Sequence, residues 1–210
     1  MRPNASAETY IWRGTDDPGR LDTAVAHFEG ERLRAHGTSL TSRHSSSWAL
    51  TTGTDLATGT EWATRTLAVA VNGDGWFRSL ELRRGVDGWS ATATAGGNAG
   101  LPAPGLAEPE ALADALDCDL GLCPLTNTMP IRRFGLHTGA GSTPALTMAW
   151  VEVPSLRVLP SRQMYRGLGN GKVEFRSADS RSGDGGFSAE LTVDHDGIVV
   201  DYPGLAALVR

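Results

Sequence analysis

The chain has 210 residues, of which 40% are hydrophobic and 20% are charged, a balance that is ordinary for a soluble globular protein. Its 19 basic and 24 acidic residues give a net charge of -5, which argues against nonspecific binding to nucleic acid or to an anionic membrane surface. Apolar runs all fall short of the roughly 20 residues that span a bilayer, and the start has no apolar core like that of a signal peptide. We therefore expect a cytoplasmic protein without a transmembrane segment.

The first part of the chain is predicted to form short strands. Its 26 glycines and 11 prolines indicate many turns rather than long helices. Turns that carry Asp and Gly between β-prone runs are typical of hairpins, and such turns stand at 72–75 and 85–88. Residues 22–36 could be amphipathic, but Gly30 and the β-branched residues favour a strand there. The predicted strands of this region are 22–36, 67–71, 76–82 and 89–94.

A stretch rich in Gly and Pro at 96–109 divides the chain near its middle. Pro and Glu near its end predict a helix over 109–116, which is about two turns long and marginal by itself. Gly167–Lys172 looks like a phosphate loop, but it lacks the P-loop spacing, so it is read as a turn before a strand starting near Lys172. The other strands predicted beyond the linker are 145–153, 187–193 and 198–202, the last two joined by a turn at 194–197.

The two sides of the linker resemble each other weakly. On each side an aromatic-led strand runs into an Asp-Gly turn, at 62–71 and at 187–193. We therefore predict a single domain, 1–210, with two related halves at about 8–95 and 117–205 joined by the linker 96–109. Two such meanders joined into one antiparallel sheet make an all-β fold. A sheet with that many strands tends to curl, and a curled sheet can enclose a central cavity.

The segment Asp117–Arg133 carries the densest set of hydrogen-bonding groups in an apparently extended stretch. Asp117 and Asp119 are two residues apart, so an extended backbone places both on one face. They could act as an acid/base pair or bind a hard cation. Alternatively, one pairs with an arginine and the other accepts backbone N–H groups.

Arg132 and Arg133 are adjacent, so on a strand they point to opposite sides. An arginine inside a rolled sheet needs a partner, because a buried unpaired charge costs several kcal/mol. That partner is either one of the two nearby aspartates or an anionic group of a ligand. Asn127 stands between two threonines and fits a tight turn; its functional interpretation is a hydrogen bond to a polar head group.

Other chemical signatures do not assemble into a catalytic or metal site. Cys118 and Cys123 are expected to be buried thiols in a reducing compartment, and a disulfide or redox pair is the alternative. The five histidines are scattered without a metal-binding pair, and no serine stands in a nucleophile-elbow pattern. We therefore expect no metal and no cofactor, and assign no catalytic residue.

Several motifs together resemble the bacterial glycolipid-binding family, a group of uncharacterised proteins with a spiral β-roll fold. The resemblance is strongest in the segment that begins at Asp117 and returns near the end of the chain. The motifs that carry it are Ile11–Arg13, Glu61–Arg65, Asp87–Trp89, Asp117–Arg133, Ala149–Val151, Gln163–Tyr165 and Val193–Gly204. One departure concerns the positions of Trp48, Leu125 and Val173, where the family often has an aromatic and this chain keeps the ring at Trp48 alone.

The resemblance implies a spiral β-roll with a central cavity that binds a glycolipid or another amphipathic small molecule without catalysis. Aromatic and aliphatic side chains would hold the tails, and polar groups within strand-like segments would hold the head. The candidate ligand-binding residues are Trp12, Arg65, Asp117, Asp119, Asn127, Arg132, Arg133, Gln163, Tyr165 and Tyr202.

Two other functions stay open on the sequence. One is an enzyme that acts on a small polar or sugar-like substrate, with Asp117 or Asp119 as general acid/base. The other is a scaffold or oligomer without a ligand, which a dry interior and a large apolar surface patch would favour. The sequence leaves the oligomeric state undetermined.

Overall fold

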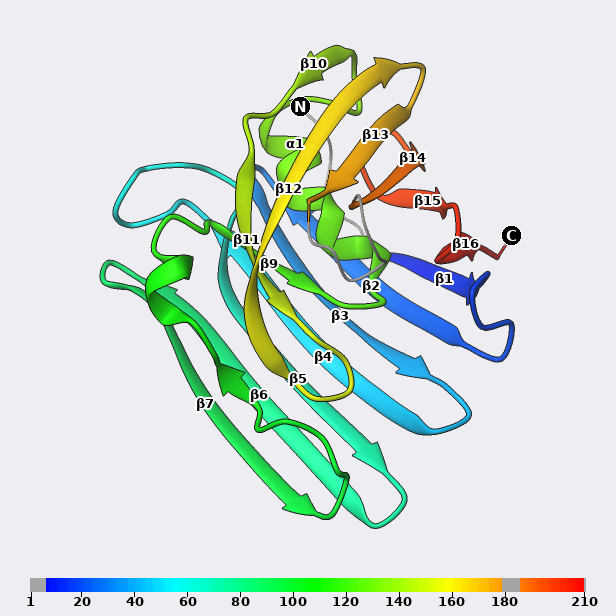
Figure 1. The fold of residues 1–210 in the computed structure, drawn as a ribbon. Helices are drawn as coiled ribbons and strands as arrows, with labels where there is room; N and C mark the ends of the chain where they lie inside the picture. The colour runs from blue at the N-terminus through cyan, green and yellow to red at the C-terminus, as the bar shows by residue number, and fades with distance from the viewer. Residues whose placement is uncertain (1–6, 179–185, 210) are drawn as a thin grey trace.

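The computed structural model describes residues 7–178 and 186–209, and within them sixteen strands form one curled, unclosed sheet (Figure 1). The sheet is mostly antiparallel, and the all-β prediction is confirmed. The sheet runs in the order β7-β6-β5-β4-β3-β2-β1-β16-β15-β14-β13-β12-β11-β9. None of the described helices is long and apolar enough to cross a membrane.

The first seven strands form a continuous meander, in which each strand pairs antiparallel with the next. Side chains alternate between the covered and the open face, as the period of two in the sequence predicts. The hairpin between β2 and β3 turns at Gly30, whose φ of 59° suits glycine. The strands are β1 (Glu8–Gly14), β2 (Leu21–Glu29), β3 (Arg32–Leu40), β4 (His44–Gly53), β5 (Ala63–Gly73), β6 (Trp76–Gly85) and β7 (Gly88–Gly97).

The remaining strands return to the first ones, because β16 pairs with β1 in the register Trp12↔Leu208. The strands thus follow in sequence order on both sides of the β1–β16 pair. This order is compatible with the two related halves expected at 8–95 and 117–205, and the duplication stays a prediction. Two short strands pair in parallel, β9 with β11 and β8 with β12. The strands are β8 (Gly105–Leu106), β9 (Asp117–Leu120), β10 (Ala140–Ser142), β11 (Leu146–Val151), β12 (Arg157–Gly169), β13 (Lys172–Ser177), β14 (Phe187–Val193), β15 (Val199–Tyr202) and β16 (Ala206–Leu208).

The central segment is extended only at its start, which corrects the sequence-based expectation. After β9 the chain forms the 3-10 helix η2 (Pro124–Asn127) and then α1 (Thr128–Arg133). Proline fits the first turn of a helix because that turn needs no N–H there, so Pro124 and Pro130 are compatible with helix rather than with an extended run. Arg132 and Arg133 therefore lie on the last turn of α1, and the argument that they alternate across a strand does not apply. The helix predicted at 109–116 is shorter, a 3-10 turn η1 (Pro109–Leu112).

The larger core lies between the meander and the segment that crosses it in Figure 1. Leu50 and Leu67 of the meander belong to the same buried cluster as Leu112 and Leu125 of the crossing segment. A second cluster lies in the C-terminal half, where Phe175 and Val199 pack with Ile131 of α1. Burial of both clusters accounts for the roll, since an open sheet must cover its apolar face.

Aromatic rings cover glycines directly across the strands. Trp48 is the register partner of Gly37, and a Cβ on Gly37 would lie 2.6 Å from the indole ring and 1.9 Å from the carbonyl oxygen of Thr23. Phe77 pairs with Gly96 in the same way, with a ring atom 2.3 Å from the position of a Cβ. These pairs fix the register, because a ring occupies the space that the glycine leaves.

Replacing Gly37 by Ala is therefore expected to lower the free energy of unfolding by about 1–3 kcal/mol, the usual cost of overpacking. Gly85→Ala is the matched control, since a Cβ at Gly85 meets nothing within 4 Å, and its effect should stay within about 0.5 kcal/mol. Urea unfolding of both variants measures the difference, and equal stability of the two would contradict the assigned register.

Candidate ligand-binding cavity

A cavity of about 340 Å³ lies in the C-terminal half of the roll, against the chain from Asp119 to Cys123. Strands β11 to β15 each contribute to its walls. Half-buried residues such as Trp150, Ser177 and Phe187 leave it in contact with solvent. The lining residues are Asp119, Leu120, Gly121, Leu122, Cys123, Asn127, Trp150, Val153, Ser161, Gln163, Phe175, Ser177, Phe187, Tyr202, Gly204 and Leu205.

One side of the cavity is a chain of polar side chains. Gln163 Nε2 donates to Asp119 Oδ2 at 2.7 Å, and Thr126 Oγ1 donates to Asp119 Oδ1 at 3.0 Å. The buried Tyr165 hydroxyl lies 2.8 Å from Gln163 Oε1 and 3.0 Å from Asn127 Oδ1. Burial, with a smaller contribution from the Asp119 carboxylate, raises the pKa of Tyr165 well above its usual value. Tyr165 thus keeps its single proton, which it can share between the side-chain oxygens of Asn127 and Gln163.

A second group of lining residues is aromatic. Phe175, Phe187 and Tyr202 contact one another with ring centroids 6.0–6.2 Å apart. The Tyr202 hydroxyl makes no hydrogen bond with any residue that the structure describes, although its side chain lines the cavity. Burial, followed by the nearby Asp119 carboxylate, raises the pKa of Tyr202, so this hydroxyl keeps its proton and can offer it to a ligand.

The model of the family described as "Putative glycolipid-binding" matches residues 9–207 of this sequence. The chain belongs to this family. A solved structure of a DUF1089 family protein from Pseudomonas aeruginosa is similar over 98% of both chains, with a TM-score of 0.62 and 24% sequence identity. At that identity the likeness concerns the fold alone. None of the curated proteins matches the sequence.

Four candidate residues of this family member line the cavity, namely Asp119, Asn127, Gln163 and Tyr202. Tyr165 is connected to them through its hydrogen bonds. The remaining five lie elsewhere: Trp12, Arg65, Asp117, Arg132 and Arg133.

Asp117 and Arg133 pair with each other away from the cavity. The guanidinium contacts the carboxylate through two hydrogen bonds of 2.7 and 2.6 Å, and Arg133 Nε donates to the carbonyl oxygen of Glu61 at 2.9 Å. The side chains are 9% and 1% exposed for Arg133 and Asp117. The sequence left two partners open for a buried arginine, a nearby aspartate or an anionic group of a ligand. For Arg133 the partner is Asp117.

Arg132 is held by aromatic rings and by the turn after β14. Its guanidinium carbon lies 4.6 Å from the ring centroid of Trp62 and 5.2 Å from that of Phe28. Its Nη1 lies 3.2 Å from the Asp196 carbonyl oxygen and 3.4 Å from Asp196 Oδ1. Such stacking on ring faces is a favourable use of arginine.

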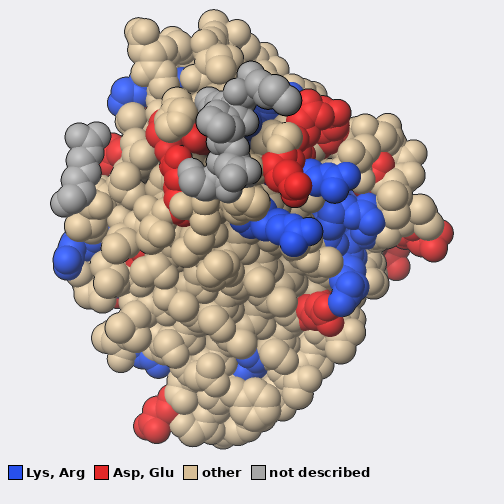
Figure 2. Space-filling model, turned by 180° about the vertical axis from the view of Figure 1, so that it is seen from behind, with Lys and Arg blue, Asp and Glu red and all other residues tan. Residues whose placement is uncertain are grey.

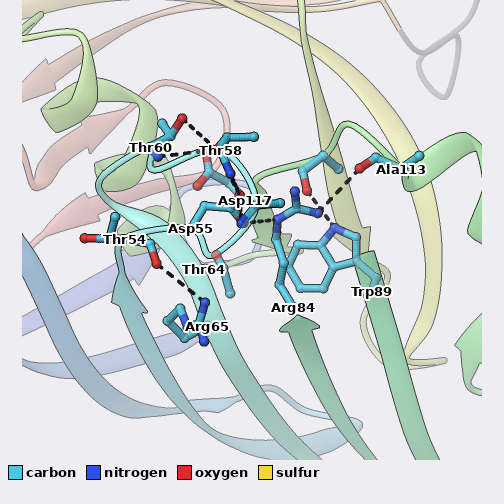
Figure 3. Close-up of polar contacts among 12 residues, drawn as sticks. Thr54, Asp55, Thr58, Thr60, Thr64, Arg65, Arg84, Trp89, Ala113 and Asp117 are labelled. Carbon is cyan, nitrogen blue, oxygen red and sulfur yellow. Dashed lines mark hydrogen bonds and ion pairs between the residues drawn. The ribbon is translucent and has the colours of Figure 1, made fainter. Parts of the chain in front are cut away.

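Trp12 and Arg65 also lie outside the cavity. The buried indole of Trp12 donates to the carbonyl oxygen of Val199 at 2.8 Å and borders a void of only about 10 Å³ on the other side of the chain at Gly121. Arg65 reaches back to the carbonyl oxygen of Thr54, at 3.5 Å (Figure 3).

Potential metal ligands come together at one place among the described residues. Ligand atoms of Glu8, His195 and Asp196 lie within 4.8 Å of one another. Arg132 already contacts Asp196, and its positive charge disfavours a cation there. Both cysteines are buried and free; burial raises the pKa of Cys118 to about 12 and that of Cys123 still further from its usual value.

A buried polar centre that sequence reasoning missed joins the β4–β5 loop to β6 (Figure 3). Asp55 accepts hydrogen bonds from Arg84 Nε at 2.7 Å and from the backbone N–H and hydroxyl of Thr58, both at 2.9 Å. Arg84 lies over the ring of Trp89, whose indole N–H donates to the Ala115 carbonyl oxygen at 2.7 Å. Because Asp55 and Arg84 are 29 residues apart, the sequence pattern offers no signal for this pair.

Proposed function

We propose that this chain binds one uncharged amphipathic molecule of the glycolipid kind in the 340 Å³ cavity, without catalysing a reaction on it. The observation that carries the proposal is the division of the cavity into a polar side, built from Asp119, Asn127 and Gln163, and an aromatic side around Phe175 and Phe187. Pockets of this size with a few fixed polar groups are typical of small-molecule sites.

The polar side suits hydroxyl groups of a sugar. Carboxylate and amide oxygens accept hydrogen bonds, and the Tyr202 hydroxyl can both donate and accept. Among the described residues that line the cavity there is no lysine or arginine. Phosphate and carboxylate ligands are normally held by such cations, so an uncharged head group fits these walls better than an anionic one.

The size of the cavity limits how much of the ligand it can hold. Small-molecule sites have volumes of about 300–1,000 Å³, so a cavity of 340 Å³ is at the small end of this range and suits one sugar ring or one short stretch of acyl chain. The aromatic side can pack against the apolar face of either. The rest of a larger amphiphile would extend past the half-buried rim.

The chemistry of the nearby groups supports binding over catalysis. Asp117, one of the two candidate acids, is tied to Arg133 away from the cavity. Both oxygens of Asp119 accept hydrogen bonds. Cys123 lines the cavity, but burial raises its pKa, and a protonated thiol is a poor nucleophile.

Titration with octyl glucoside below its critical micelle concentration tests the proposal, because Trp150 lines the cavity and its fluorescence reports binding. We expect saturable 1:1 binding, visible also by native mass spectrometry, and weaker binding of octyl phosphate. Phe187→Ala should weaken binding by about tenfold to a hundredfold, from the lost apolar contact.

Phe134→Ala is the matched control, since Phe134 is 38% exposed and does not line the cavity, and it should bind as the wild type does. Equal losses in both variants, or no saturable binding of the glucoside by folded protein, would refute the cavity as the site. Tighter binding of octyl phosphate would refute the uncharged head group.

A further inference from the structure

Strand β7 ends the sheet, and its outer backbone edge pairs with no described strand, although β8 and η1 lie close to it. Among the described strands it pairs with β6 alone, over ten residues and without a register shift. Its sequence from Gly88 to Gly97 contains no charged residue and no proline. Natural sheet edges are usually blunted by charges, prolines, bulges or a covering segment, because free N–H and C=O groups invite another strand.

The middle of β7 is exposed on both of its faces. Trp89 near its start is fixed through its bond to Ala115, but Thr92, Ala93, Thr94 and Ala95 are all exposed. No backbone hydrogen bond reaches β7 from any described segment other than β6. The free edge is therefore accessible at its centre.

The outer face beside this edge consists mostly of small residues, and the charged residue that borders it, Glu81, is paired with Arg83. A shallow hollow of about 470 Å³ is bordered by side chains such as Ser47, Ala68, Ser79 and Thr94. Figure 2 shows this side of the molecule, with most charged groups in its upper part and a broad area below in which few charged groups appear. An incoming strand and its side chains would meet little steric or electrostatic resistance there.

We propose that β7 pairs antiparallel with β7 of a second copy of this chain, so that the sheet continues across a two-fold axis near Ala93. In that register Thr92 faces Thr94 of the second copy. The chain already forms hydrogen-bonded threonine pairs between neighbouring strands, Thr23 with Thr38 at 2.8 Å and Thr51 with Thr66 at 2.7 Å. The new pair repeats a contact that stabilises antiparallel sheets.

The charges of the neighbouring strand are compatible with this pairing. Glu81 is the β6 partner of Thr92, and Ser79 is the β6 partner of Thr94. Across the interface, Glu81 is followed by Thr92, by Thr94 of the second copy and by Ser79 of the second copy. Glu81 is therefore in line with a serine and not with another acid. Although each chain carries a net charge of -5, no like charges face each other on this row, and like charges directly opposite would oppose pairing.

Sedimentation across the micromolar concentration range tests the proposal. The wild-type protein is expected to shift from the 22.2 kDa monomer towards twice that mass as its concentration rises. The double variant Thr92→Lys/Thr94→Lys places lysines opposite lysines across the axis and should weaken association by about tenfold or more. Ser45→Lys is the matched control, on the same exposed face but on the inner strand β4, and it should associate as the wild type does.

A single introduced cysteine reports the register directly. Ala93→Cys should form an intermolecular disulfide on mild oxidation, because directly opposed residues of antiparallel strands lie at a distance that a disulfide can bridge. The native thiols are buried and Ser45→Cys serves as the control without cross-linking. Wild-type protein that stays monomeric, association that survives the lysine pair, or equal cross-linking at Ser45 and Ala93 would each overturn the proposal.

Discussion

Replacing Arg133 by Met is expected to destabilise the protein by about 3–5 kcal/mol, because it leaves the Asp117 carboxylate buried without its partner. Asp117 is only 1% exposed, and both of its oxygens accept hydrogen bonds from Arg133. The pair ties the last turn of α1 to β9, and through the carbonyl oxygen of Glu61 to the end of the β4–β5 loop. Urea unfolding measures the loss.

Arg166→Met is the control for this variant. Arg166 pairs with Glu174 on the surface, where its side chain is 59% exposed, and an exposed pair contributes only about 0–1 kcal/mol. The double variant Asp117→Leu/Arg133→Met removes both charges and should recover much of the stability, because no buried charge is then left alone. Similar losses for Arg133→Met and Arg166→Met would show that the pair is not desolvated as described.

Many strands were predictable because their residues alternate and their turns carry glycine, but β1, β4 and β12 were not predicted, and the strand expected at 22–36 is the hairpin of β2 and β3. Hairpins such as β5–β6 and β6–β7 follow from local pattern alone. The family resemblance is confirmed, and the curled sheet that it implied is the observed fold. Buried free thiols at Cys118 and Cys123 were also predicted correctly.

The central segment was misjudged because hydrogen-bonding density does not reveal backbone conformation. Pro124 and Pro130 were compatible with either an extended run or the first turn of a helix. The segment is helical because the helices bury Leu125 and Met129 in the core. The cavity walls were only half predictable. Gln163 and Asn127 stand out in the sequence as polar groups, whereas Phe175 and Phe187 look like ordinary strand aromatics until the sheet curls and brings their rings together.

Replacing Asp55 by Asn is expected to cost about 3 kcal/mol or more at neutral pH, since it removes the charge that balances the buried Arg84. Asp55 and Arg84 have side chains only 1% and 4% exposed. Burial alone would raise the pKa of Asp55, but hydrogen bonds from Thr58 and the pairing with Arg84 outweigh it and hold the pKa below its ordinary value of 3.8. The ionised carboxylate is thus favoured in the folded state.

The pH dependence of this contribution has a definite sign. A carboxyl whose pKa is lowered by folding stabilises the protein above its ordinary value of 3.8 and loses that contribution as the pH falls through the lowered value. The difference in unfolding free energy between wild type and Asp55→Asn should therefore shrink on acidification.

Asp22 is expected to behave in the opposite way. Burial raises its pKa, although hydrogen bonding to Ser39 and the charge of Arg20 lower it. Folding therefore disfavours ionised Asp22, and this destabilising contribution disappears as the carboxyl is protonated at low pH. Urea unfolding of wild type, Asp55→Asn and Asp22→Asn between neutral and acidic pH separates the two, and parallel curves for all three proteins would refute both assignments.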